Sequence, residues 1–390
     1  MRRKKSVIFL IFSAVLFIMP VFGCGADAYG ISERTQFMNE LASSLVMSPD
    51  MIEMQKSFDG LLYYDNLDYE TKYNYAEIYS AIEGFKGDVT VFGLSEEALG
   101  DAFKAVLLDH PELFYIKGYT FSRHLENGTV KYYSFSGKYE MSEEECIQKR
   151  ELVDAQIGPL LSEIALCDND YDKIMLIYEY IVDNTRYVAG TDNEYNMLSC
   201  ILDGKAVCQG YAKAFQYICN RAGIKCSLVE GTRKETGESH AFNIVLADGE
   251  YYYADPTWVD SSYTYGSDTP EEAAPFTNFD YLLVNSEDIL LEHTVTDYDN
   301  MPLCESVNDN YYVKEGLCID DEDISALDCI MRKQADNGVI RIRCENEEIY
   351  AFVYDYLVNS QHIFDYLDGQ CGVSYIVNEK FKSLTFWVYQ

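Results

Sequence analysis

The chain has 390 residues and a formal net charge of −35 at pH 7, from 65 acidic and 30 basic residues. This length exceeds what one ordinary hydrophobic core supports, so two or three domains are expected. The acidic balance argues against nucleic acid as a partner, because phosphate binding needs clustered Lys and Arg.

The first residues predict an export signal, residues 1–28. Residues 2–5 are basic, and a mostly apolar run of 13 residues extends from Val7 to Met19. A membrane-spanning helix needs about 20 residues, so this run is typical of a signal peptide. Val21 to Cys24 resembles a bacterial lipobox with Cys24 as the lipidated residue, and Ala26-Asp27-Ala28 is an alternative cleavage site. We expect a surface lipoprotein or a secreted protein; an uncleaved membrane anchor is the third option.

Residues 29–166 are predicted to form an N-terminal α+β accessory domain. Apolar periodicity and turn residues indicate two helices, two strands and a long helix, near residues 68–83, 95–108, 113–121, 130–139 and 142–166. Asn127-Gly128 between the two strands is a strong hairpin signal. No catalytic constellation is visible in this part of the sequence.

Residues 167–300 are predicted to form the catalytic core. Its first helix is indicated by Ile174, Ile177, Tyr178 and Ile181, which recur at helical spacing. Three aspartates precede or open this helix, at positions 168, 170 and 172, but the glycine of a calcium loop is absent. Helix N-capping explains them better.

Cys208 lies at the start of a second predicted helix. After Ala206 the residues Tyr211, Phe215, Ile218 and Ala222 recur at helical spacing, and Gly223 provides a C-terminal stop. The unpaired N–H groups and the dipole of a first helical turn favour a thiolate. Glycines 204 and 210 on either side would let another segment approach closely. The alternative interpretation is an inert core cysteine.

His240 and Asp255 are predicted to meet on one face of a β-hairpin. Residues 224–230 and 240–247 indicate strands, and Asp248-Gly249 is a two-residue turn signal. If Ala247 pairs with Glu250, His240 and Asp255 become diagonal neighbours on one sheet face. A slip of one residue would place them on opposite faces. After this hairpin, 259–275 is expected to be a surface loop and 279–284 a last core strand.

Residues 301–390 are predicted to form a separate small α+β domain. The pattern indicates a helix around residues 324–330, closed by Gly338, and then a strand, a helix and a strand pair over 339–343, 349–357, 373–377 and 384–389. Its role is not apparent from the sequence.

Cofactor and metal sites are not expected. The 12 cysteines show no CxxC or other regular zinc spacing. Cys200, Cys219 and Cys226, which flank the Cys208 helix, are interpreted first as core residues and second as disulfide partners.

Three sequence blocks together resemble the transglutaminase-like superfamily of thiol enzymes. They are Gly204-x-x-x-Cys208-x-Gly210-Tyr211-Ala212, His240-Ala-Phe-Asn243 and Asp255-Pro-Thr-Trp258, within about residues 170–298. The resemblance implies a papain-like α+β core, in which a helix carrying Cys packs on an antiparallel sheet carrying His and Asp. It also implies Cys208 as nucleophile, His240 as base and Asp255 as the residue that orients it. Phe242 departs from the family, where many relatives have Trp.

These observations predict a thiol enzyme that acts on amide or peptide bonds through an acyl-enzyme, with hydrolysis favoured. The expected partner is an extracellular protein or peptide, with cell-wall peptide as one candidate. Gln209, Tyr211 and Trp258 are the candidate residues of the substrate cleft. A cross-linking transglutaminase and a non-catalytic surface binding protein on the same fold are the alternatives.

Overall fold

The structure is a computed structural model that describes residues 49–389 except 92–94, 127–128, 192, 260–276 and 368–371. Several predicted features therefore lie outside the described residues. They are the signal segment, the lipidated Cys24, the turn expected at Asn127-Gly128 and nearly all of the loop expected at 259–275. The chain divides into two compact units after Leu152, within helix α6 (Glu143–Ile164). No helix among the described residues combines the length and apolarity that a membrane crossing requires.

The N-terminal unit is a three-stranded antiparallel sheet with helices. The strands are β1 (Val89–Val91), β2 (Ile116–Glu126) and β3 (Thr129–Tyr139), in the order β1-β3-β2. The helices are α2 (Pro49–Ser57), α3 (Leu62–Asp65), α4 (Tyr69–Glu83) and α5 (Glu96–Asp109). The predicted helices and strands of this region are thus present, with boundaries displaced by a few residues.

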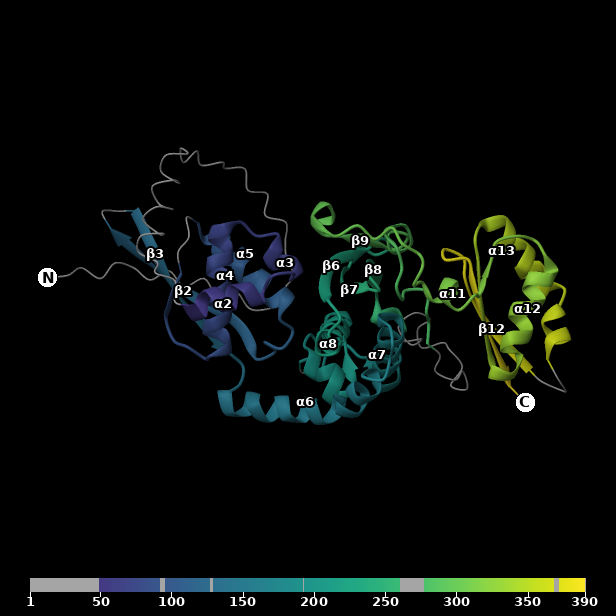
Figure 1. Ribbon diagram of the computed structural model, residues 1–390, viewed down its shortest axis with the longest axis horizontal. Coiled ribbons are helices and arrows are strands. Elements are labelled where there is room, and N and C mark those ends of the chain that lie inside the picture. Colours follow the sequence, from purple (N-terminus) through teal and green to yellow (C-terminus); the bar gives the residue numbers. More distant parts are fainter. Residues whose placement is uncertain are drawn as a thin grey trace. The chain divides into compact units, whose positions relative to one another are not determined.

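The core of the second unit places one long helix against a four-stranded antiparallel sheet (Figure 1). The helix is α8 (Cys208–Arg221), and the strands in spatial order are β8 (Glu250–Ala254), β7 (Ser239–Ala247), β6 (Cys226–Arg233) and β9 (His293–Val295). Around them lie α7 (Asp170–Asn184), the short parallel pair β4 (Arg186–Tyr187) and β5 (Lys205–Ala206), and α10 (Ser286–Ile289). This arrangement confirms the predicted α+β class.

Two local predictions in this core were wrong. The segment 279–284 is not a strand: Leu283 has a φ of 53°, and the segment meets β8 only in a bridge between Tyr253 and Val284. Its apolar residues are buried without strand geometry, and the fourth strand of the sheet is β9. The second prediction assigned the N-cap of α7 to one of the aspartates at 168, 170 and 172. The N-cap is instead Asn169, whose Oδ1 accepts the N–H of Asp172 at 2.8 Å.

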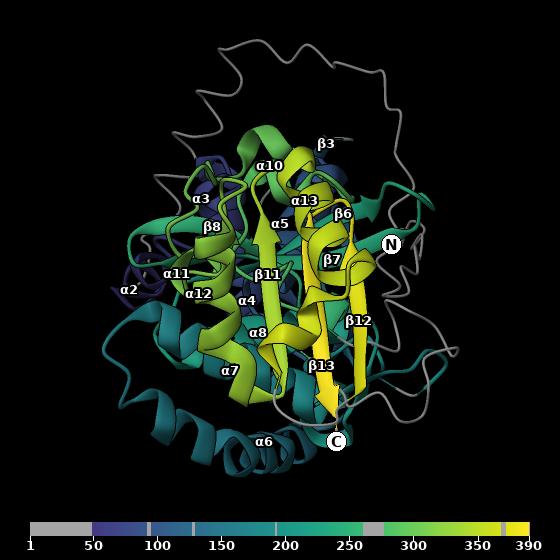
Figure 2. The ribbon, with the colours of Figure 1, turned by 90° about the vertical axis from the view of Figure 1, so that its right-hand side faces the viewer.

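The C-terminal region is a four-stranded sheet covered on one face by helices. The spatial strand order is β10 (Cys318–Ile319), β11 (Val339–Cys344), β13 (Ser383–Tyr389) and β12 (Gly372–Asn378). Figures 1 and 2 both show α12 (Ile324–Gln334) and α13 (Glu347–Tyr354) over the same sheet face. Ile340 and Ile342 of β11 are buried in the cluster that these helices form. The predicted helices and strands are present, and β10 was not predicted.

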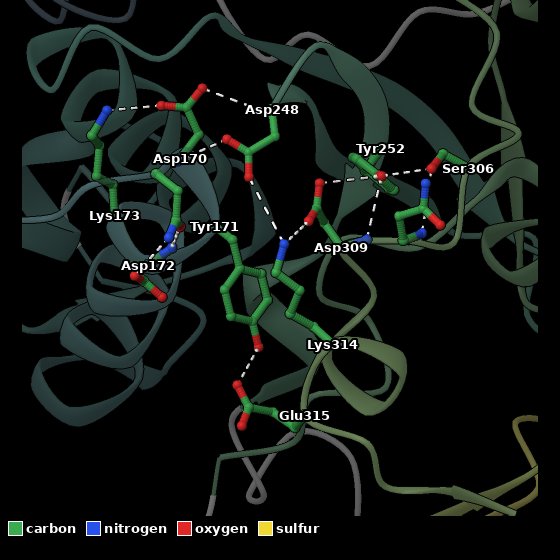
Figure 3. Close-up of polar contacts among 12 residues, drawn as sticks. Asp170, Tyr171, Asp172, Lys173, Asp248, Tyr252, Ser306, Asp309, Lys314 and Glu315 are labelled. Carbon is green, nitrogen blue, oxygen red and sulfur yellow. Dashed lines mark hydrogen bonds and ion pairs between the residues drawn. The ribbon is translucent and has the colours of Figure 1, made fainter.

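A polar network links the start of this region to the core (Figure 3). Lys314, in the short helix α11 (Tyr311–Lys314), binds Asp309 at 2.5 Å. The hydroxyl of Tyr171 in α7 donates to Glu315 at 3.1 Å, and the hydroxyl of Tyr252 in β8 donates to Ser306 at 2.7 Å. The segment that follows residue 300 is therefore tied to α7 and β8.

The ten cysteines among the described residues are all free thiols. Cys200, Cys219 and Cys226 are buried, which agrees with their interpretation as core residues.

Candidate active site

Cys208 is the first residue of α8. The preceding residue, Val207, is extended with φ −102° and ψ 177°, so the helix begins abruptly at the thiol. The helix forms here because Tyr211, Phe215 and Ile218 bury one stripe against the sheet. Cys208 itself is only partly buried, and it lies where the first-turn N–H groups have no helical partner.

The two glycines near Cys208 allow close backbone contacts at the start of α8. Gly204 has a φ of 63°, and a Cβ there would lie 2.8 Å from the carbonyl oxygen of Asn184. A Cβ at Gly210 would lie 2.6 Å from the carbonyl oxygen of Glu194. That same carbonyl accepts the N–H of Val207 at 3.1 Å. Both positions therefore require glycine, and the segment around Glu194 lies directly against the start of α8.

The β7–β8 hairpin brings His240 and Asp255 together. Ala247 pairs with Glu250 and Asn243 with Ala254, which is the predicted register. The Nε2 atom of His240 lies 2.6 Å from Oδ2 of Asp255, and the two side chains are 1% and 0% exposed.

Asp255 is oriented by backbone as well as side-chain contacts. It follows β8 directly, and its own N–H donates to the carbonyl oxygen of Tyr281 at 2.9 Å. Its Oδ1 accepts the N–H of Thr257 at 3.0 Å. Burial favours the neutral acid, but the imidazoles of His240 and His293 outweigh it and hold the pKa of Asp255 well below its usual range.

Cys208 and His240 form the second contact of the site. Burial opposes ionisation of the thiol, but a hydrogen bond from His240, its charge and the N–H of Ala241 lower the pKa of Cys208. Burial also opposes the imidazolium, yet Asp255 and Cys208 raise the pKa of His240 to about 10. Because Nε2 of His240 faces Asp255, Nδ1 is the ring atom left for the thiol. The arrangement favours a thiolate–imidazolium pair at neutral pH.

The candidate cleft residues differ in exposure. Gln209 is partly buried at the start of α8. Tyr211 is fully buried and stacks on Tyr187 at 6.4 Å between centroids, so it packs inside the core. Trp258 is buried against Tyr281 at 5.0 Å, and the Arg233 guanidinium lies 4.9 Å from its ring centroid.

Two residues near the site were not found from the sequence. Tyr195 is 43% exposed; a hydrogen bond to Glu194 raises its pKa, and Cys208 adds to this effect. His293 in β9 places its Nε2 atom 3.0 Å from Oδ2 of Asp255. Neither residue stands in a local motif, and His293 is separated from Asp255 by residues 256–292. Only the three-dimensional pairing of β6 with β9 brings His293 into the site.

His240, Asp255 and His293 are the one group of potential metal ligands among the described residues. Their closest donor atoms are 2.6 and 3.0 Å apart. Two ligands of a tetrahedral zinc with bonds of about 2.0–2.1 Å lie roughly 3.3 Å apart. The observed spacing is therefore that of hydrogen bonds, and the arrangement does not fit a tetrahedral zinc ion.

The comparison with protein families points to the same part of the chain. Residues 160–256 match the family model of the transglutaminase-like superfamily. Human Kyphoscoliosis peptidase is 27% identical over 121 residues, covering 27% of this chain and 18% of the human protein. The mouse protein of that name is 28% identical over 117 residues, covering 26% of this chain and 17% of its own length. The chain thus spans less than a fifth of either relative.

Solved structures overlap this chain at low similarity. A TGase structure has a TM-score of 0.28 and 15% identity, covering 40% of this chain and 47% of that one. A candidate cysteine protease from Cytophaga hutchinsonii has a TM-score of 0.24 and 16% identity, covering 35% and 61%. Cys208, His240 and Asp255 all fall within the family match. The part of the chain that carries the candidate site, residues 160–256, is thus similar to the transglutaminase-like superfamily.

Proposed function

We propose that the chain is a cysteine enzyme that cleaves amide or peptide bonds, with Cys208 as nucleophile, His240 as acid and base, and Asp255 as its orienting carboxylate. The observation that carries the proposal is the continuous hydrogen-bonded chain from the thiol at the start of α8 to the buried carboxylate. A nucleophile, a base and a group that orients the base are the elements that acyl transfer requires.

In the proposed first step, the Cys208 thiolate attacks the carbonyl carbon of the substrate. The carbonyl oxygen becomes an oxyanion, and the N–H of Cys208 at the helix start is suited to donate to it. Collapse of the intermediate breaks the carbon–nitrogen bond, and His240 gives its Nδ1 proton to the leaving amine. The product is a thioester on Cys208.

In the proposed second step, His240 takes a proton from water as the water attacks the thioester carbon. The carboxylic acid leaves, and the thiolate–imidazolium pair is restored. Asp255 stays ionised throughout, because its pKa lies well below the usual range. Its carboxylate holds Nε2–H of His240 in place and stabilises the imidazolium. An amine in place of water would give acyl transfer through the same thioester.

The hydrolytic assignment draws support from the relatives. The human and mouse proteins that share 27% and 28% identity with about a quarter of this chain are named as peptidases. We propose an extracellular peptide as the substrate, with cell-wall peptide as a candidate, because residues 1–28 resemble an export signal. Mass spectrometry of the mature N-terminus in the native host tests the proposed export, since a lipidated Cys24 and a chain beginning after Ala28 differ in mass.

The direct test compares wild type with Cys208→Ala on a library of peptide amides, with and without a fluorescent primary amine. Cys329→Ala is the matched control, because Cys329 is an exposed thiol in α12. We expect turnover in wild type and the control and none in Cys208→Ala. Full turnover in Cys208→Ala would refute the thiol mechanism. Amine incorporation faster than hydrolysis would assign the chain to acyl transfer instead.

A further inference from the structure

One buried carboxylate oxygen in the site accepts hydrogen bonds from two imidazole rings. Oδ2 of Asp255 lies 2.6 Å from Nε2 of His240 and 3.0 Å from Nε2 of His293. The side chains of Asp255 and His293 are 0% exposed. The proposed mechanism uses His240 and Asp255, but it assigns no role to His293.

His293 is held firmly in this position. In the β6–β9 ladder it pairs with Arg233. Its ring lies 5.1 Å from that of Phe242, and it meets the rings of Trp258 and Tyr281 edge-on at 5.7 and 6.0 Å. Packing and strand pairing therefore both fix the direction of its Nε2 atom.

The hydrogen bonds determine where the ring hydrogens lie. An ionised carboxylate only accepts, so Nε2 of both imidazoles must carry a hydrogen. Nδ1 of His293 is buried and has no hydrogen-bond partner among the described residues. His293 thus adds a second Nε2–H donor to the Asp255 carboxylate.

The other charged or titratable groups around His293 are engaged elsewhere. The hydroxyl of Tyr281 donates to Glu292. The guanidinium of Arg233 lies over the Trp258 ring and 3.6 Å from Glu238. Asp255 is therefore the group toward which the polar edge of His293 is directed.

We propose that His293 is a positioning residue, which fixes the Asp255 carboxylate so that Nδ1 of His240 stays directed at the Cys208 thiol. The inference rests on the proposed function. His293 touches no reacting atom and acts through Asp255. Without its hydrogen bond, Oδ2 would keep only its contact with His240, and the Thr257 N–H on Oδ1 would be the one other restraint on the orientation of the carboxylate. Displacements of about 1 Å at such a distance from the chemistry can cost on the order of 100-fold in rate.

The test measures alkylation of Cys208 by iodoacetamide from pH 5 to 9, read by peptide mass spectrometry, with the exposed thiol of Cys329 as reference in each sample. His293→Phe keeps a ring and removes the donor, whereas His293→Gln keeps a donor close to the Nε2 position. We expect His293→Phe to label roughly tenfold more slowly than wild type at pH 6, with its half-maximal rate at higher pH. His293→Gln should stay within about twofold of wild type.

Three outcomes separate this inference from the proposed function. A wild-type profile in His293→Phe, with a collapsed profile in His240→Ala, would show that His293 only packs. An unchanged profile in His240→Ala would refute the proposed function and this inference together. If His293→Phe does not fold, His293→Asn replaces it, since its shorter amide cannot reach Oδ2. Slow labelling in His293→Asn and recovery in His293→Gln would then support the inference, and equal labelling in both would overturn it.

Discussion

Nε2 of His240 lies 2.6 Å from Oδ2 of Asp255, in a location where both side chains are excluded from solvent. Burial alone would drive both groups toward their neutral forms. Their mutual attraction instead raises the pKa of His240 and lowers that of Asp255. The imidazolium that results is the group that stabilises a thiolate on Cys208.

Alkylation of Cys208 should therefore be fast below the pH at which a free thiol reacts. The thiolate is the reactive form, and a lowered pKa of Cys208 keeps it populated below about pH 8.5. In His240→Ala the hydrogen bond and the charge are lost while burial remains, so the pKa of Cys208 should rise. One pKa unit corresponds to a tenfold lower thiolate fraction, and we expect labelling at pH 6 to fall by at least about tenfold.

Other thiols in the same sample provide the controls. Cys329 is exposed and should label alike in wild type and His240→Ala. Cys304 and Cys344 should stay unlabelled in the folded protein, because burial raises the pKa of each to about 12. Equal labelling of Cys208 in wild type and His240→Ala would show that the two side chains do not form an ion pair.

Asp255→Asn should abolish most of the activity and change its pH dependence. In wild type the pKa of His240 is about 10, so the imidazolium that protonates the leaving amine persists to alkaline pH. Without the carboxylate charge, this pKa should fall toward its ordinary value of about 6.5. The alkaline limb of kcat should then move to lower pH, and kcat at neutral pH should fall by about 10²–10⁴-fold.

A pH series of kcat on one peptide amide measures this effect. Asp168→Asn is the control, because Asp168 is an exposed carboxylate just before α7. Its profile should match that of wild type. An Asp255→Asn profile with the wild-type alkaline limb would mean that the carboxylate does not set the charge of His240.

Local sequence signals were sufficient to predict the contact between His240 and Asp255 and the position of Cys208 at a helix start. The turn Asp248-Gly249 imposes the register of the hairpin, and that register brings His240 to Asp255. The apolar stripe of α8 and the extended Val207 place Cys208 at the helix start. Each of these features depends on neighbours within about ten residues, so periodicity and turn chemistry are informative.

Those local signals could not predict the pairing of strands that are far apart in the sequence. The strand β9 has only three residues, and its partner β6 lies about 60 residues earlier in the chain. Neither its length nor its composition distinguishes it from a loop. Residues 279–284 are apolar because they are buried, and burial does not distinguish a strand from an irregular segment. His293 and the true sheet edge were missed for this reason.

Gly231→Ala should destabilise the sheet at the edge where β6 pairs with β9. A Cβ at Gly231 would lie 1.9 Å from the carbonyl oxygen of Thr294, so β6 and β9 must separate. We expect a loss of about 1–3 kcal/mol in the free energy of unfolding, measured by urea denaturation. Ser227→Ala in the same strand adds no atom, and should change that free energy by about 0.5 kcal/mol or less. Equal stability of the two variants would contradict this close approach.

The C-terminal sheet should stabilise the core through Asp280. This buried carboxylate accepts hydrogen bonds from Tyr312 at 2.8 Å, Asn378 at 2.9 Å and Ser383 at 2.9 Å. Burial raises the pKa of Asp280, while these three donors oppose the shift. Asp280→Ala leaves two buried donors, on Tyr312 and Ser383, and the partly buried amide of Asn378 without this acceptor, so we expect a loss of about 3–5 kcal/mol in the free energy of unfolding.

Asp280→Ala should also affect the candidate site, because the residue after Asp280 contacts the backbone of Asp255. The carbonyl oxygen of Tyr281 accepts the N–H of Asp255 at 2.9 Å. Asp280→Ala should therefore slow Cys208 alkylation at pH 6 as well as lower the urea midpoint. Glu315→Gln, a change at a partly buried position in the same interface, should alter the free energy of unfolding by about 1 kcal/mol or less. If a chain ending at residue 300 kept the wild-type midpoint and alkylation profile, the C-terminal region would be an independent domain, as the sequence first indicated.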